Sequence, residues 1–128
     1  MAKTILNILA TSYRATLEEQ DDTVVWLTQA MRGNGAHANL LLRGSCVNYG
    51  MPDQHSQGLK IGTWQQKNPP DLVRDLKSLN DKGAKIYYVE EDAAHLGLEK
   101  TELLNFLHPV SETQLAKLFA NYDYVWQW

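Results

Sequence analysis

The chain has 128 residues and a formal net charge of −3, and 44% of its residues are hydrophobic while 21% are charged. This balance predicts one globular domain over residues 1–128 with a sizeable core. A negative net charge argues against direct nucleic-acid binding, because phosphate contacts need clustered lysine and arginine. No run reaches the roughly 20 apolar residues that cross a membrane. The single cysteine excludes an intramolecular disulfide and suits a reducing cytoplasm.

The first 43 residues are predicted to form a strand, a helix and a second strand. The apolar run 4–10 predicts a buried strand, and the polar stretch 11–20 predicts a loop at its carboxyl end. Asp21 or Asp22 can cap a helix that continues to about Arg32, where apolar residues recur at helical spacing. The apolar run 38–42 predicts the second strand.

The stretch 44–70 is long for a connection inside a compact domain, and such connections are usually functional or partly structured. We expect another subunit to cover some of its apolar side chains. Alternatively, these side chains fold back on their own domain. The stretch carries Tyr49, Met51, His55, Ile61 and Trp64.

The second half of the chain is predicted to alternate helices and strands. Helices are predicted over 71–82, 99–105 and from Ser111, where Gln114 completes a capping-box spacing, with a single turn over 93–96. Strands are predicted over 84–89, 106–110 and 123–128. In the last strand, Tyr124, Trp126 and Trp128 would share one face. Alternating strands and helices predict a three-layer α/β/α fold around a five-stranded parallel sheet.

Three polar segments are predicted to follow strands at the same end of this sheet. Ligands of open α/β sheets bind outside the carboxyl ends of the strands, so these segments are the predicted ligand pocket. They consist of Thr11, Ser12, Tyr13 and Arg14, then Gly44, Ser45 and Cys46, and finally Glu90, Glu91, Asp92 and His95. No phosphate-binding glycine pattern occurs, and no cofactor is expected.

Cys46 is the only thiol nucleophile that the chain offers. A thiolate is strongly nucleophilic, and Arg14, Arg43 or a helix N-terminus near the sulfur would favour it. The acids at 90–92 would instead raise the pKa of the thiol. The alternative is that Cys46 is a small, inert, half-buried apolar residue.

The acidic segment also has two interpretations. Glu91 and His95 would share a helical face and could act as an acid–base pair or bind a divalent metal. The alternative, which we favour, is a set of helix-capping acids, because local spacing fixes no second histidine nearby. We therefore predict no metal site.

The segment 83–128 is laid out as a strand AKIYYV, a loop, a small helix ending in glycine, AAHLGL, a helix EKTELLNFL, a short strand with Pro-Val-Ser, a helix SETQLAKLFANY and a closing strand YDYVWQW. In this layout it resembles the DsrE/DsrF-like family of sulfur-relay proteins. The resemblance implies a five-stranded parallel sheet in three layers and a homotrimer or homohexamer. It also implies sulfur relay or sulfur transfer, with a sulfur-carrier protein as partner.

One departure from the family matters for function. Active members carry persulfide on a cysteine just after the strand that corresponds to 84–89, and here Glu90, Glu91 and Asp92 follow that strand. Two functions therefore stay open. Cys46 could serve as the sulfur carrier from a neighbouring strand, or the chain could be a non-catalytic subunit that binds a small ligand or partner protein.

Overall fold

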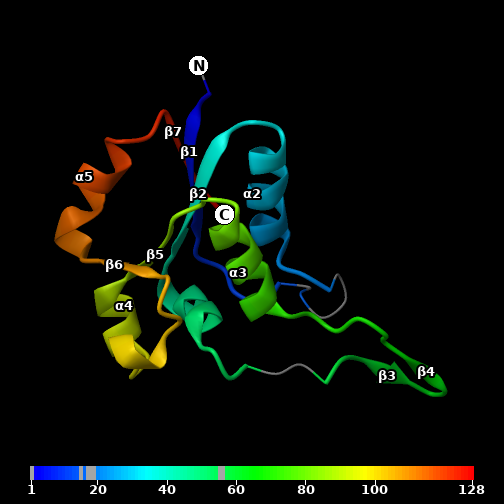
Figure 1. Ribbon diagram of the computed structural model, residues 1–128. Coiled ribbons are helices and arrows are strands. Elements are labelled where there is room, and N and C mark those ends of the chain that lie inside the picture. The colour runs from blue at the N-terminus through cyan, green and yellow to red at the C-terminus, as the bar shows by residue number, and fades with distance from the viewer. Residues whose placement is uncertain (1, 15, 17–19, 55–56) are drawn as a thin grey trace.

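A five-stranded sheet, parallel throughout, lies at the centre of the computed structural model, which describes residues 2–14, 16, 20–54 and 57–128 (Figure 1). The strand order is β6-β5-β2-β1-β7. This arrangement, with helices on both faces, confirms the predicted α/β/α fold. The strands are β1 (Thr4–Leu9), β2 (His37–Leu42), β5 (Ile86–Val89), β6 (His108–Val110) and β7 (Tyr124–Gln127).

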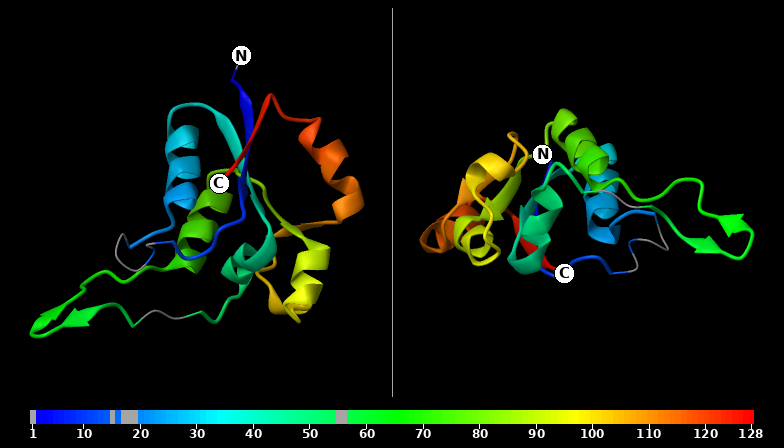
Figure 2. Two further views of the ribbon diagram at one scale, coloured as in Figure 1. Left: turned by 180° about the vertical axis from the view of Figure 1, so that it is seen from behind. Right: turned by 90° about the horizontal axis from the view of Figure 1, so that it is seen from below.

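Two helices, α2 (Thr23–Gly33) and α3 (Leu72–Asp81), lie on one side of the sheet, and α5 (Leu115–Phe119) lies on the other (Figures 1 and 2). Alternating side chains of the strands fill both interfaces, as the pleat of a strand requires. On the α2–α3 side the core includes Leu9, Leu40, Leu42, Leu76 and Leu79. On the α5 side it includes Leu6, Ile8, Leu41, Val89 and Leu115.

The predicted helix starts are confirmed, and their caps are visible. The Asp22 carboxylate accepts hydrogen bonds from the backbone amides of Val24 and Val25. The Asp71 carboxylate accepts one from the amide of Arg74. In each case the side chain satisfies amides that the first turn of a helix leaves unpaired.

Two local predictions in the second half are wrong. The helix expected over 99–105 is only a 3-10 turn, η2 (Lys100–Glu102), because the amide of Leu104 turns away to donate to the carbonyl of Gly50 at 2.8 Å. The turn expected over 93–96 belongs to a helix, α4 (Glu90–His95), that starts at the end of β5. Its three leading acids suit the positive end of the helix dipole.

The described part of the stretch 44–70 is partly structured, as we expect of a connection this long. It begins with a 3-10 helix, η1 (Gly44–Gly50), and continues into a hairpin of β3 (Lys60–Ile61) and β4 (Trp64–Gln65). Tyr49 is buried in its own domain, so for this residue the fold-back alternative holds. Ile61 and Trp64 are exposed in this chain. His55 lies outside the described residues.

The C-terminal strand β7 has the face predicted for it. The rings of Tyr124 and Trp126 stack at a centroid distance of 5.8 Å, and Trp128 donates its indole N–H to the Asn7 side chain. Val125 points to the opposite face and packs in the α5-side core. Within the described residues, no helix has the length and apolarity that a membrane crossing requires.

Candidate functional site

The three predicted pocket segments meet at the carboxyl end of the sheet, which we call the rim. The hydroxyl oxygens of Ser12, after β1, and Ser45, after β2, lie 2.6 Å apart. The amide of Gly44 donates to the Asp92 carboxylate at 2.8 Å, which ties α4 to the start of η1. Adjacent parallel strands bring these segments together, as predicted from the topology. Their role in binding a ligand stays a prediction.

Two of the acids in α4 accept hydrogen bonds from backbone amides. Asp92 accepts from Gly44, and both carboxylate oxygens of Glu91 accept from the amide of Glu112, at 3.1 and 3.0 Å. Glu112 begins the 3-10 helix η3 (Glu112–Gln114), so Glu91 caps it from a distance in sequence. Across the described residues, no cluster of three or more His, Cys, Asp and Glu side chains could hold a metal ion.

Cys46 lies on the inner side of η1 and is completely buried. A 3-10 helix has three residues per turn, so side chains at i and i+3 point the same way. Cys46 and Tyr49 therefore face the core together, while the neighbouring Ser45 stays exposed. Val47 is also buried, so η1 packs much of its length against the domain.

The surroundings of Cys46 disfavour its thiolate. Burial raises the pKa of Cys46 to about 12, and the negative charge of Asp22 acts in the same direction. Arg14 opposes both effects. The contribution of Arg14 was predicted from the sequence, but that of Asp22 was not.

A buried hydrogen-bond network adjoins Cys46. The Tyr49 hydroxyl donates to Oδ2 of Asp22 at 2.7 Å and accepts from the amide of Tyr13 at 2.6 Å. Burial and the bond to Asp22 raise the pKa of Tyr49, so its hydroxyl stays protonated at neutral pH. This network connects the loop after β1, the start of α2 and η1.

Tyr13 closes the network on its solvent side. Its backbone is left-handed, with φ +56°, a conformation that costs a non-glycine residue roughly 1–2 kcal/mol. Its ring meets that of Tyr49 edge-on, with centroids 4.9 Å apart. We infer that the hydrogen bond and the ring contact with Tyr49 offset the backbone strain and hold the half-exposed Tyr13 ring at the rim.

Sequence reasoning missed the roles of Asp22 and Tyr49 in this site. Asp22 was expected only as a helix cap, and Tyr49 only as an apolar group in a long connection. The two residues are 27 positions apart in the sequence, and no local pattern predicts their contact. The side of η1 that faces the core determines where Tyr49 points. A 3-10 helix this short has no strong repeat of apolar residues from which that side could be predicted.

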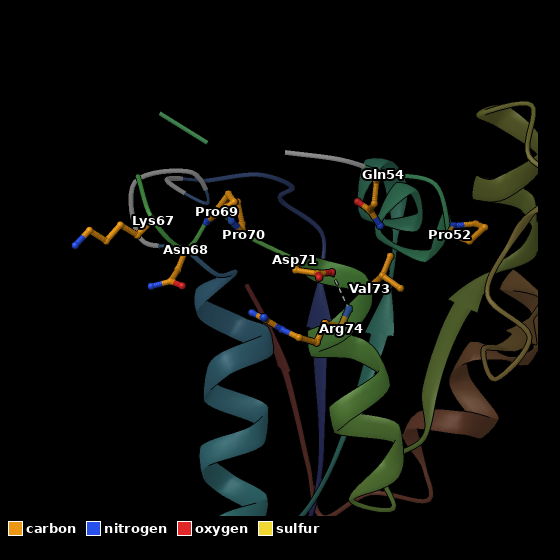
Figure 3. A pocket seen from close by; sticks show the side chains of 9 residues that line it. All are labelled: Pro52, Gln54, Lys67, Asn68, Pro69, Pro70, Asp71, Val73 and Arg74. Carbon is orange, nitrogen blue, oxygen red and sulfur yellow. Dashed lines mark hydrogen bonds between the residues drawn. The ribbon is translucent and has the colours of Figure 1, made fainter. Parts of the chain in front are cut away.

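A hollow of about 560 Å³ lies beside the rim, between the segment after η1 and the start of α3 (Figure 3). Small-ligand pockets have volumes in this range. The Gln54 amide at its border donates to the carbonyls of Tyr49 and Met51. None of the predicted pocket residues lines this hollow. It is lined by Pro52, Gln54, Lys67, Asn68, Pro69, Pro70, Asp71, Val73 and Arg74.

No family model matches the chain, and no curated protein matches it. Several solved structures are similar. The YchN protein of E. coli is 17% identical over 100% of both chains, with a TM-score of 0.73. A protein of unknown function from Methanobacterium thermoautotrophicum is 9% identical over 98% of each chain, with a TM-score of 0.67. Another, from Bacteroides thetaiotaomicron, is 14% identical over 97% of this chain and 94% of its own, with a TM-score of 0.67. At these identities the likeness establishes a shared three-layer fold.

Proposed function

We propose that this chain is a DsrE-like binding subunit of cytoplasmic sulfur metabolism. It would hold a small ligand or a partner protein, such as a sulfur carrier, at its rim by non-covalent contacts. The observation that carries the proposal is the complete burial of the Cys46 thiol beside Asp22. It favours the binding subunit over a carrier that stores persulfide on Cys46.

The chemical reason is that sulfur transfer needs an accessible thiolate. A thiol with a pKa of about 12 is ionised in about 1 molecule in 100,000 at pH 7, against about 3 in 100 for a free thiol. The alternative location for a carrier, just after β5, holds the acids of α4, and two of these are engaged with backbone amides. A non-covalent role at the rim requires no reaction at the Cys46 thiol or at the residues just after β5.

The proposal includes assembly into a homo-oligomer, with a trimer or hexamer expected from the family resemblance. Large apolar side chains are exposed at two separate places, Ile61 and Trp64 on the hairpin and Trp126 and Trp128 near the C-terminus. Exposed apolar groups gathered in this way are typical of protein interfaces. Sedimentation velocity at micromolar concentration tests this part, and a monomer would contradict it.

Persulfide loading followed by intact-mass measurement tests the binding-subunit proposal. We expect the folded protein to gain no sulfur from a low-molecular-weight persulfide donor, and Cys46 to be alkylated fully only in denaturant. A gain of one sulfur atom per folded chain, absent in Cys46→Ala, would establish a carrier and overturn the proposal.

A matched variant provides the positive control. The double variant Ser45→Cys, Cys46→Ala moves the thiol by one residue to the exposed side of η1. This thiol should load and alkylate in the folded state. The comparison therefore separates an inaccessible thiol from an ineffective donor.

A further inference from the structure

The β3–β4 hairpin, with its flanking residues 57–67, forms an arm that reaches beyond the body of the molecule (Figures 1 and 2). Its strands join through Gly62 and Thr63, with Gly62 at φ +59°, where a type II′ turn takes glycine. Ile61 and Trp64 are cross-strand partners and are 69% and 55% exposed. A two-stranded hairpin alone is marginally stable in water, so this arm needs a surface to pack on.

The charge of the arm narrows the choice of that surface. Residues 57–67 contain two lysines, Lys60 and Lys67, and no acid. Both lysines are exposed, and neither forms a salt bridge within the described part of the chain. An apolar tip between basic residues is complementary to an acidic surface with an exposed apolar group.

The segment of α4 and η2 provides such a surface. Residues 90–102 contain five acids and one lysine. Glu90, Glu99 and Glu102 are exposed and form no salt bridge in the described residues, and Leu96 nearby is 39% exposed. We call this surface the acidic face.

The arm and the acidic face lie on opposite sides of the molecule, both toward the carboxyl end of the sheet (Figures 1 and 2). The arm leaves beside the start of α3, whereas α4 follows β5 at the other end of the molecule. The body of the domain separates them, so the arm does not reach the acidic face of its own chain. A second copy of the chain presents this face to it.

We infer that the arm of one copy docks on the acidic face of the next, head to tail. Ile61 and Trp64 cover Leu96, while Lys60 and Lys67 face the exposed glutamates. Two unlike surfaces on one chain make a heterologous contact, which continues until a ring closes. This inference rests on the homo-oligomer of the proposed function and specifies how its copies meet.

The contact has a consequence for the rim. Asp92 of α4 binds the amide of Gly44, so the acidic face adjoins the start of η1. An arm seated there brings an aromatic side chain of the neighbouring copy to the edge of each rim. The binding site is then completed only in the assembly.

Disulfide trapping tests the head-to-tail contact. Thr63→Cys places a thiol at the tip of the arm, and Leu96→Cys places one on the acidic face. With oxidised glutathione, the double variant should form covalent dimers and higher species that dithiothreitol reverses. Each single variant should stay uncrosslinked, because like surfaces do not meet. Cross-linking in a single variant, or none in the double variant, would overturn the inference.

Charge exchange provides a second test by sedimentation. Reversing Lys60 and Lys67 to Glu should weaken assembly at least about tenfold, as should reversing Glu99 and Glu102 to Lys, and combining all four changes should restore it. Lys117→Glu, on α5, is the control and should leave assembly unchanged. A monomeric wild-type chain would remove the oligomer and this inference together. An oligomer insensitive to these reversals would remove only this inference and would favour the aromatic face of β7.

Discussion

Replacing Tyr49 with phenylalanine removes one hydroxyl from the buried network and keeps the ring that fills the core. That hydroxyl donates to Oδ2 of Asp22 at 2.7 Å and accepts from the amide of Tyr13 at 2.6 Å. Asp22 is only 3% exposed, and among the described residues Tyr49 is the one donor to Oδ2. The variant therefore leaves a buried carboxylate oxygen without its partner.

The expected loss of stability follows from these two bonds. A hydrogen bond to a charged group contributes roughly 1.5–3 kcal/mol, and a bond from a neutral amide contributes roughly 0.5–1.5 kcal/mol. We expect Tyr49→Phe to lower the free energy of unfolding by about 2–4 kcal/mol. No cavity term is added, because the ring remains in place.

Urea denaturation followed by circular dichroism measures this change, and Tyr122→Phe is its matched control. Tyr122 is also partly buried, but the hydrogen-bond partners of its hydroxyl, Asn39 and Tyr87, are uncharged. Tyr122→Phe should lower the free energy of unfolding by about 1 kcal/mol. The reasoning is refuted if Tyr49→Phe costs no more than Tyr122→Phe.

Two further predictions concern packing and pH. Gly50→Ala should lower the free energy of unfolding by about 1–3 kcal/mol in the same assay, because the added Cβ would lie 2.5 Å from a methyl carbon of Leu107. Gly33→Ala is the control. Its added Cβ would meet nothing within 4 Å, so the free energy of unfolding should hardly change. The raised pKa of Cys46 means that the folded state holds the thiol proton more tightly than the unfolded state, whose thiol titrates near pH 8.5. The contribution of this thiol to the free energy of unfolding is therefore complete below about pH 8.5 and is lost as the pH rises toward 12. Between pH 7 and pH 9.5 the free energy of unfolding of the wild type should fall by about 1.4 kcal/mol from this source. Cys46→Ala should lack this part of the pH dependence. Equal pH dependence in the two proteins would show that the folded-state thiol is not shielded.

Much of the fold could be predicted because its signals are local. Apolar runs of strand length, the acids that cap α2 and α3, and the Ser111–Gln114 capping box each depend on residues within one turn or one strand. The parallel order follows from their alternation. The failure at 99–105 shows the limit, because Leu104 exchanges a helical bond for one to the carbonyl of Gly50.

The candidate site was only partly predictable, for a related reason. Topology brings the loops after β1 and β2 together with α4, and the contacts of Ser12 with Ser45 and of Gly44 with Asp92 follow from it. What topology does not specify is the direction of each side chain on a short 3-10 helix. The acids of α4 were weighed against Cys46, yet the acid whose charge raises its pKa is Asp22.

The orientation of η1 links the stability of the rim to the burial of Cys46. Within η1, the side chain of Ser45 is exposed and that of Cys46 is completely buried. A thiol at position 45 would therefore be accessible to solvent, whereas the thiol at position 46 is part of the core. Two bonds hold η1 in this orientation, from Gly44 to Asp92 at its start and from Tyr49 to Asp22 near its end. The contacts that stabilise the rim are thus the same ones that withdraw the thiol from solvent. This burial supports the proposed non-covalent role of the rim, because a sulfur carrier needs a thiol that solvent can reach.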